Sequence, residues 1–376
     1  MARVIHVSSA HHLLDTRIFY RMARSLAADG HEVTVAAAAP PDSTVPPSLD
    51  GVRLIALPPR AGRMARFLRR PFDILRAIRA DRYDLVHFHD PDLLPWMLAL
   101  RLSGRRIVYD AHEAYRDNIA GKTWIPAPLR WLARAGVVAL EGLAARWLDG
   151  VVAASQPILD KIAPRRGAVV RNFMSKDLAL EIGAPPIAER APAICYFGSV
   201  TADRAAVEMV EAFVLVRAAR PDCRVVVGGR IAEDVDAARL RERMAAAGVE
   251  YVSFLQQREM LDAISACRLG LCLYKPTPAY LEGEYPTKLL DYICVGTPTV
   301  TGAGLPNAVA LVERLRCGAV ADQESPADIA RVVLDLLDDT ARLQTMSDAG
   351  RRAFLDELNW DHARANLRRL YDAILR

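Results

Sequence analysis

The chain has 376 residues, of which 52% are hydrophobic and 25% are charged, and its formal net charge is +4. This balance is typical of a folded globular protein, and the length predicts two or three domains. The charge is small, and the lysines and arginines do not form the dense basic and aromatic surface of a nucleic-acid groove. We therefore expect no nucleic-acid partner.

The N-terminal residues and the apolar stretches bear on location. Residues 3–8 predict a strand that enters the fold directly, because His6 interrupts the apolar run that a cleavable signal would need. Residues 135–145 are the longest apolar candidate, but Glu141 interrupts them, and no run reaches the about 18 apolar residues of a spanning helix. These features predict a cytoplasmic protein.

Apolar runs of four to six residues alternate with amphipathic segments through the first half of the chain. Such runs are typical of parallel strands that are buried on both faces. They predict a doubly wound α/β domain. The predicted strands are residues 3–8, 32–37, 52–57, 84–89, 105–110 and 150–154.

A basic segment, residues 60–82, lies inside this half of the chain. It has two aspartates, Asp73 and Asp81, and interleaved apolar residues, and we expect Pro71 to split it into two helices. Its basic amphipathic character favours an anionic lipid surface, while an ordinary solvated helix over the N-terminal sheet accounts for it equally well. Its eight arginines are Arg60, Arg63, Arg66, Arg69, Arg70, Arg76, Arg79 and Arg82.

The strand and helix rhythm restarts after a polar, proline-rich stretch. This restart predicts domains at residues 1–172 and 193–358, a linker at 173–192, and a closing helix at 359–376 that packs back across the domains. All six cysteines lie in the second half without a C-x-x-C pair, so we expect reduced core thiols. The second set of strands is predicted at residues 194–197, 224–227, 251–254, 269–273, 297–301 and 319–321.

Residues 280–300 join an acidic, aromatic loop to a short helix that carries a lysine in its first turn. Pro286 suits the first helical position and Gly296 the residue past the end, so the helix is predicted at 286–295. Its N-terminal N–H groups and Lys288 would hold a phosphate, and Asp291 a polyol one turn deeper. Alternatively, Lys288 and Asp291 simply pair on a surface helix.

Five stretches in a fixed order carry a resemblance. DTRIFYRMARSLAADGHEVTV, YDLVHFHDPDLLPWMLAL, VYDAHE, PAYLEGEYPTKLLDYICVGTPTV and the Trp360 helix resemble, in this order, the family-4 retaining glycosyltransferases, and most closely a branch that acts in bacterial surface-polysaccharide assembly. The resemblance spans nearly the whole chain. It implies the GT-B fold: two Rossmann-like domains facing across a cleft, with no cofactor and no metal requirement.

The resemblance places the donor on the second domain. Lys288 and Arg204 are the predicted catalytic cations, since fixed positive charges stabilise a departing diphosphate. The family has an arginine and a lysine after the Gly198 turn, and here those places hold Ser199 and Arg204. One cation is therefore missing, and Arg230 is the candidate replacement.

Acidic and loop residues complete the predicted donor site. Asp291 stands where the family has a glutamate that grips the ribose hydroxyls, and Glu282 resembles the acidic residue that faces the donor sugar, with Glu284 as its competitor. The other donor-binding candidates are Leu255, Tyr280, Tyr285, Pro286 and Thr287.

His112 resembles the histidine of the N-terminal domain that lies near the donor sugar, where an imidazole would orient a hydroxyl or manage the acceptor proton. Asp15 and Arg17 follow the first strand and are candidates for the acceptor side. An N-cap role for Asp15, with Arg17 on the surface, fits the sequence equally well. His87, His89 and His112 raise the question of a metal, but strand-end histidines more often bond locally, and we predict none. The acceptor-side candidates are Asp15, Arg17, His87, His89, Asp110 and Glu113.

Together these features predict transfer of a sugar, with retention, from a nucleotide-diphosphate donor to a carbohydrate or lipid-linked acceptor. Two alternatives remain open. A nucleotide-sugar epimerase shares this architecture and needs no acceptor. Ser199 and Asp291 would also fit a catalytically weak nucleotide-sugar-binding protein.

Overall fold

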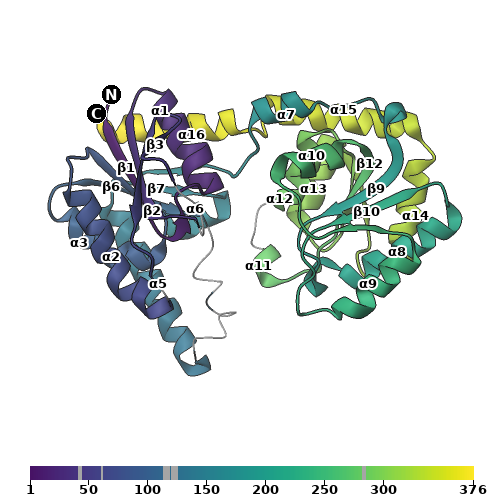
Figure 1. Ribbon diagram of the computed structural model, residues 1–376, viewed down its shortest axis with the longest axis horizontal. Coiled ribbons are helices and arrows are strands. Elements are labelled where there is room, and N and C mark those ends of the chain that lie inside the picture. Colours follow the sequence, from purple (N-terminus) through teal and green to yellow (C-terminus); the bar gives the residue numbers. More distant parts are fainter. Residues whose placement is uncertain (41–44, 61, 113–118, 120–125, 282–284) are drawn as a thin grey trace. The chain divides into compact units, whose positions relative to one another are not determined.

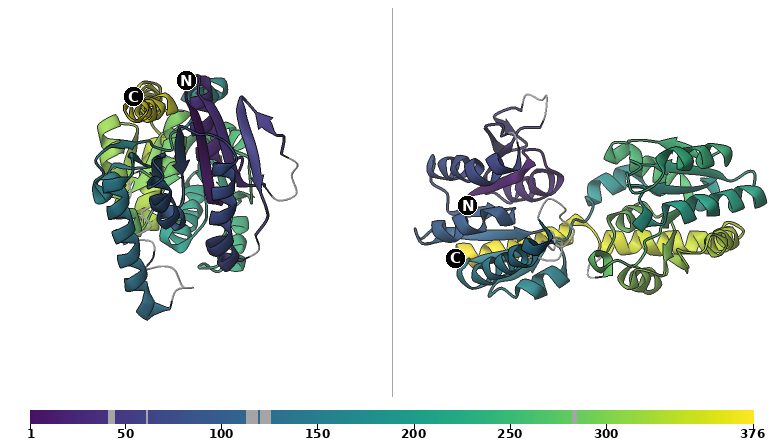
Figure 2. Two further views of the ribbon diagram at one scale, coloured as in Figure 1. Left: turned by 90° about the vertical axis from the view of Figure 1, so that its left-hand side faces the viewer. Right: turned by 90° about the horizontal axis from the view of Figure 1, so that it is seen from below.

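The structure is a computed structural model of the 376-residue chain, and it describes residues 1–40, 45–60, 62–112, 119, 126–281 and 285–376. The chain divides into two compact units (Figures 1 and 2). The first unit contains Met1–Asn172 and Trp360–Arg376, and the second contains Phe173–Asn359. Each unit is built on one sheet with helices packed against it.

The sheet of the first unit has eight strands in the order β3-β4-β2-β1-β5-β6-β7-β8. All neighbouring pairs are parallel except β3 and β4. All six predicted strands are present, and β3 and β8 are additional. The strands are β1 (Arg3–His12), β2 (Glu32–Ala38), β3 (Ser48–Leu49), β4 (Val52–Leu57), β5 (Leu85–Phe88), β6 (Arg106–Ala111), β7 (Gly150–Ala153) and β8 (Gly167–Val169).

Helices cover both faces of this sheet (Figure 1). On one face, Ile5, Phe88 and Tyr109 form a core with α2, α3 and α5. On the other face lie η1 and α16, and a Cβ atom at Gly150 of β7 would touch Leu370 and Ile374 of α16. The helical segments are η1 (Thr16–Ala23), α1 (Arg24–Ala28), α2 (Arg63–Arg79), η2 (Pro91–Leu93), α3 (Leu94–Arg101), α5 (Ala127–Trp147), α6 (Gln156–Ile162) and α16 (Trp360–Leu375).

Helix α2 corrects one prediction, because it continues through Pro71 instead of being split there. A proline inside a helix removes one backbone hydrogen bond and costs about 3 kcal/mol. Here the following turns bury Ile74 and Ile78 completely in the core, and this packing offsets the loss. The prediction of two helices considered the local cost alone.

The second unit has a six-stranded parallel sheet in the order β11-β10-β9-β12-β13-β14. All six predicted strands are present. They are β9 (Ala191–Phe197), β10 (Arg224–Gly228), β11 (Glu250–Val252), β12 (Cys267–Cys272), β13 (Thr299–Gly302) and β14 (Gly318–Ala321).

Helices α8, α9 and α14, with Leu343 and Met346 of α15, form a large core against one face of this sheet, and α10 packs with α7 and α12 beyond the other. The helical segments are α7 (Lys176–Ile182), η4 (Ile187–Glu189), η5 (Ala202–Arg204), α8 (Ala206–Ala219), α9 (Ala237–Ala246), α10 (Gln257–Ser265), α11 (Pro278–Leu281), α12 (Thr287–Cys294), α13 (Pro306–Leu315), α14 (Pro326–Leu337) and α15 (Thr340–Asp356).

The last helix, α16, belongs to the first unit although it follows the second in sequence. The Trp360 indole N–H donates to the Ser25 hydroxyl over 2.7 Å, and Arg364 pairs with Asp29 at 2.6 Å. Its apolar positions are buried, as the sequence pattern predicts. The chain therefore closes on its own N-terminal unit.

Two composition-based predictions are also addressed by the structure. All six cysteines are buried and unbridged, which confirms that they are core thiols. Among the described residues, no helix combines the length and the hydropathy that crossing a bilayer requires.

Candidate active site

Three adjacent strands of the first unit carry polar side chains on one face. Strand side chains alternate between faces, so the residues that flank the apolar core positions of β1, β5 and β6 point the other way. His6 of β1 lies in register with His87 of β5. Two residues on, His89 follows the end of β5, and Asp110 occupies the same face of β6. This face is the one covered by η1 and α16.

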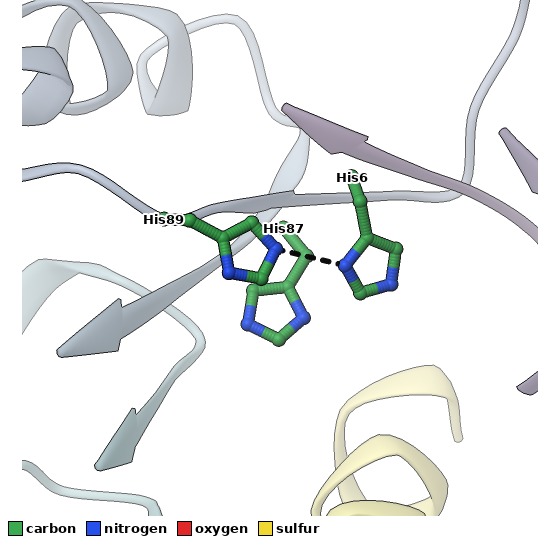
Figure 3. A group of neighbouring side chains, drawn as sticks. All are labelled: His6, His87 and His89. Carbon is green, nitrogen blue, oxygen red and sulfur yellow. Dashed lines mark hydrogen bonds between the residues drawn. The ribbon is translucent and has the colours of Figure 1, made fainter. Parts of the chain in front are cut away.

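The histidines on this face form a buried chain (Figure 3). His6 Nδ1 lies 2.9 Å from His89 Nε2, and His89 Nδ1 lies 2.9 Å from Asp110 Oδ2. His87 Nδ1 lies 2.8 Å from the Tyr371 hydroxyl of α16. Burial lowers the pKa of His6 and of His87 well below the usual histidine range. Both are therefore neutral rings that hydrogen-bond.

Arg17 anchors the carboxylate in this chain. Its Nε and Nη2 atoms donate to the two oxygens of Asp110 over 2.8 and 2.7 Å, and Nη1 donates to Val170 O and Asn172 Oδ1. Burial alone would raise the pKa of Asp110, but the Arg17 charge and these hydrogen bonds hold it well below its usual range. The surface position considered for Arg17 is therefore wrong.

Asp15 has the N-cap role that was considered for it. Its Oδ1 accepts from the backbone N–H groups of Arg17 and Ile18, at the start of η1. Its other oxygen, Oδ2, lies 3.1 Å from His11 Nδ1. The cap therefore directs Arg17 inward and holds the His11 ring.

His112 follows β6 directly. Its Nε2 atom lies 3.0 Å from His11 Nε2, and its Nδ1 atom lies 3.9 Å from Asp110 Oδ2. Burial lowers the pKa of His112, whereas the hydrogen bond to Asp15 raises the pKa of His11. The structure thus brings His87, His89, Asp110, Asp15, Arg17 and His112 into one contiguous network, while Glu113 lies outside the described residues.

The second unit holds a different arrangement at the carboxyl ends of β9 and β10. Gly198 and Gly229 follow these strands with φ of +138° and +135°. A Cβ atom at Gly229 would lie 2.0 Å from Gly198 O, so only glycine allows the two turns to approach. A Cβ atom at Gly198 would lie 3.3 Å from Lys288 Nζ and 3.7 Å from Arg204 Nη1. Both predicted cations therefore face this turn.

Lys288 is a buried cation, with 5% of its surface exposed. Its Nζ atom lies 3.6 Å from the centre of the Tyr196 ring and 5.1 Å from that of Tyr274. It has no hydrogen-bond partner among the described residues, so it does not pair with Asp291 as the alternative interpretation required. Burial lowers the pKa of Lys288 well below the lysine value.

Arg204, the second predicted cation, lies beside Lys288 at the end of η5. The guanidinium stands 5.4 Å from the Tyr274 ring centre and donates to Ser199 O over 3.2 Å. The hydroxyl of Tyr280, a predicted donor residue, donates to Asp203 over 2.6 Å. Both cations therefore lie against the Tyr274 ring, and the described residues supply Lys288 with no acceptor.

The remaining donor candidates are less closely connected. Asp291 is buried on α12, the helix of Lys288. Pro286 is the N-cap of that helix, which begins at Thr287, one residue later than predicted. Arg230 is exposed, and Leu255 is half-buried in the loop after β11. Within the described residues, no hydrogen bond joins either of them to Lys288. Tyr285 precedes the helix, while Glu282 and Glu284 lie outside the described residues.

Two family models match the sequence. The model described as Glycosyltransferase Family 4 matches residues 16–173, and the model described as Glycosyl transferases group 1 matches residues 180–353. Together they cover most of the chain. The protein belongs to the family-4 glycosyltransferases. A search of curated proteins gave no match for this glycosyltransferase.

Solved structures agree with this assignment. The glycosyltransferase has a TM-score of 0.69 with sucrose-phosphate synthase from Thermosynechococcus elongatus, at 18% identity over 99% of this chain and 98% of that one. Its TM-score with a glycosyltransferase from Rickettsia africae is 0.72, at 13% identity over 99% of this chain and 98% of that one. For Anabaena HepE in complex with UDP-glucose, the TM-score is 0.70, at 13% identity over 99% of this chain and 100% of that one. The fold is therefore GT-B.

Several residues of this glycosyltransferase were missed by sequence reasoning. His11 and Asp90 stand at or just after the carboxyl ends of strands, and that position was a usable signal. Tyr196 and Tyr274 likewise stand at or after strands β9 and β12. Tyr371 had no signal, because it joins the histidines across 284 residues of sequence.

Proposed function

We propose that this glycosyltransferase transfers a sugar from a nucleotide-diphosphate donor to a carbohydrate or lipid-linked acceptor, with retention at the anomeric carbon. The observation that carries the proposal is the buried ammonium of Lys288, which faces the Gly198 turn beside Arg204 and has no hydrogen-bond partner among the described residues. The second unit would bind the donor and the first unit the acceptor.

A diphosphate is the ligand that best satisfies this arrangement. An unpaired buried cation is costly, and Arg204 adds repulsion, so a ligand with negative charge gains both interactions. The N-terminus of α12, with Lys288 in its first turn, adds free N–H groups and a positive dipole end. These groups would stabilise the charge that develops on a leaving diphosphate, in place of a metal or cofactor.

Retention requires the acceptor to attack the face from which the diphosphate departs. We assign no covalent nucleophile. In this mechanism the departing phosphate oxygen helps to deprotonate the acceptor hydroxyl, which places most of the barrier lowering on Lys288 and Arg204. His112 would orient a hydroxyl of the substrates, the role that the family resemblance implies for this histidine.

The solved relatives support a uridine nucleotide as the first donor to test. Anabaena HepE was solved with UDP and with UDP-glucose, and an E. coli trehalose-6-phosphate protein was solved with UDP-2-fluoro glucose. We propose an acceptor in polysaccharide or glycoconjugate assembly, in line with the sequence resemblance.

Thermal-shift measurements with UDP, GDP, ADP and dTDP would identify the base, because a ligand at a hundred times its Kd stabilises by about 2.7 kcal/mol. Transfer is then assayed with the matching nucleotide sugars, and the anomeric configuration of the product is read by NMR. Release of nucleotide diphosphate with an α-linked product from an α-linked donor supports the proposal.

Two results would overturn it. Interconversion of the donor sugar without any acceptor would identify the epimerase alternative. Donor binding without turnover across the acceptor panel would identify a binding protein.

We also propose that the protein is cytoplasmic and attaches peripherally to the inner face of the cell membrane through α2. This helix exposes Leu68 and Phe72 together with Arg69, Arg76 and Arg79. Two other arginines of the basic segment already have partners within the protein. Arg60 pairs with Asp73 at 2.8 Å, and the buried Arg70 donates to Pro58 O. Three arginines near an anionic surface contribute about 1 kcal/mol each.

Sedimentation with anionic vesicles tests this attachment. We expect binding in 0.1 M salt that fades at 1 M, because the screening length shortens from about 10 Å to about 3 Å. Changing Arg69, Arg76 and Arg79 to glutamine should abolish it. The matched control changes three exposed arginines of the second unit, Arg239, Arg241 and Arg342. Equal binding by both triple variants would refute the role of α2.

A further inference from the structure

Two imidazoles and a carboxylate converge at the carboxyl ends of three neighbouring strands in the first unit. His11 lies near the end of β1, Asp90 follows β5, and His112 follows β6. The Nε2 atoms of His11 and His112 are 3.0 Å apart, and Asp90 Oδ1 lies 3.8 Å from His11 Nε2. One ligand atom from each residue lies within 4.8 Å of the other two.

The outer nitrogen of each ring faces a carboxylate. His11 Nδ1 lies 3.1 Å from Asp15 Oδ2, and His112 Nδ1 lies 3.9 Å from Asp110 Oδ2. Asp15 holds the His11 ring by a hydrogen bond, and the Nε2 atoms of the two rings meet at 3.0 Å. Histidines that bind metals almost always have a hydrogen-bonded partner on the other nitrogen, as His11 does, because it sets the tautomer and strengthens the ligand.

Asp90 supplies the independent evidence for a ligand. Its side chain is 1% exposed, and Oδ2 accepts from the Ser8 hydroxyl over 2.7 Å and from the Ser9 N–H over 2.8 Å. The other oxygen, Oδ1, is buried and has no hydrogen-bond partner among the described residues. Leaving a buried carboxylate oxygen without a donor is costly, and a cation between Oδ1 and the two rings would remove that cost.

Two neighbouring groups of potential ligands fit a metal less well. His6, His87 and His89 are fully buried and offer no negative charge, and His6 and His89 are hydrogen-bonded to each other (Figure 3). In the group of His89, Asp110 and His112, both carboxylate oxygens are held by Arg17. The His11 group alone among these three combines a partly exposed ring with a carboxylate oxygen that has no hydrogen-bond partner.

We propose that His11, Asp90 and His112 bind one divalent transition-metal ion per chain. Two imidazoles and one carboxylate suit zinc and the neighbouring divalent metals, and three protein ligands leave coordination positions open for a hydroxyl or phosphate oxygen. The sequence raises the question of a metal only for His87, His89 and His112 and predicts none, so this proposal departs from that prediction. The proposed metal site shares no residue with the proposed phosphate site, because Lys288 and Arg204 belong to the other unit.

The competing explanation is a shared proton. A proton between the two Nε2 atoms would also account for their 3.0 Å separation, and it would leave Asp90 beside an imidazolium. A bound metal and this proton exclude each other, so the experiment separates them.

Titration of the chelator-stripped, full-length protein with Zn²⁺, followed by calorimetry and by elemental analysis after dialysis, tests the proposal. We expect one zinc per chain, and His11→Ala and Asp90→Asn should each weaken binding at least tenfold. His12→Ala is the matched control, because His12 is the next residue of β1 and its side chain is exposed. It should bind zinc as the parent does. Substituting Co²⁺ should give visible absorption bands that the His11→Ala variant lacks.

Three outcomes would overturn the proposal. They are the absence of zinc binding, equal binding by the parent and the His11→Ala variant, and loss of zinc in His87→Gln but not in Asp90→Asn. Asp90→Asn keeps the side-chain shape and guards against misfolding of the alanine variant. Thermal stabilisation by the cognate nucleotide should persist in every variant, so a failure of the donor proposal is recognised separately.

Discussion

Asp110 in the first unit and Lys288 in the second are both charged groups removed from water, yet their surroundings differ. Asp110 receives two hydrogen bonds from Arg17 and lies 2.9 Å from His89. Lys288 faces two aromatic rings and a glycine turn and has no hydrogen-bond partner among the described residues. A buried charge that its own chain satisfies holds structure in place. One that its chain leaves unsatisfied indicates a ligand.

The largest expected effect concerns the satisfied charge. Arg17→Ala leaves the Asp110 carboxylate buried without its cation, so the free energy of unfolding of the first unit should fall by about 3–5 kcal/mol. Urea denaturation measures this loss. Arg331→Ala is the control, because Arg331 pairs on the surface with Asp328 and Asp335, and its loss should cost less than about 1 kcal/mol.

A double variant sharpens this test. Replacing both partners, as in Arg17→Met with Asp110→Leu, should destabilise less than Arg17→Ala alone, because no uncompensated charge remains. If the single Arg17 variant were as stable as the parent, the anchoring role of the pair would be refuted.

The next effect concerns the unsatisfied charge. Lys288→Ala and Arg204→Ala should each lower turnover by about a hundredfold or more, the scale on which one charge-stabilising group contributes. Urea denaturation is measured beside turnover, so that a loss of stability is told apart from a loss of chemistry. Lys161→Ala, an exposed lysine of the first unit, is the control. Retention of more than half of the parent turnover by both variants would contradict the phosphate assignment.

A His112 variant tests whether the first unit serves transfer while the second unit binds the nucleotide. His112→Ala should lower transfer by about a hundredfold, the lower end of a general acid–base contribution. Nucleotide affinity, measured by calorimetry, should stay nearly unchanged, because the proposed nucleotide site lies in the other unit. An equal loss of nucleotide affinity would place His112 at the donor.

The smallest effect is a pH dependence of nucleotide binding. Burial lowers the pKa of Lys288 well below the usual 10.5, and a bound diphosphate would raise it again. Between these two values the free lysine is neutral and the bound one is charged, so binding takes up a proton and affinity falls as pH rises.

Calorimetry in buffers with different ionisation enthalpies counts this proton. We expect uptake of up to one proton per nucleotide within that window and none in Lys288→Met. Absence of uptake by the parent across the alkaline range would mean that Lys288 is already charged in the free protein.

Local patterns in the sequence determined the two α/β halves and the start of α12. The strands were visible because each buries both faces and reads as an apolar run. The α12 helix was visible because Pro286 and Gly296 mark its ends, and Gly296 has the positive φ, 63°, that favours glycine after a helix. The phosphate-binding role of Lys288 follows from this local geometry and stays a prediction.

Tertiary structure alone decided the network of the first unit. The order β1, β5, β6 brings His11, Asp90 and His112 together across about a hundred residues, and no local pattern states which strands become neighbours. The inward turn of Arg17 depends on Asp110, 93 residues away. Likewise, α2 continues through Pro71 because the core packing of its later turns outweighs a local cost. Local sequence sets which segments form, and burial with long-range pairing sets which side chains meet.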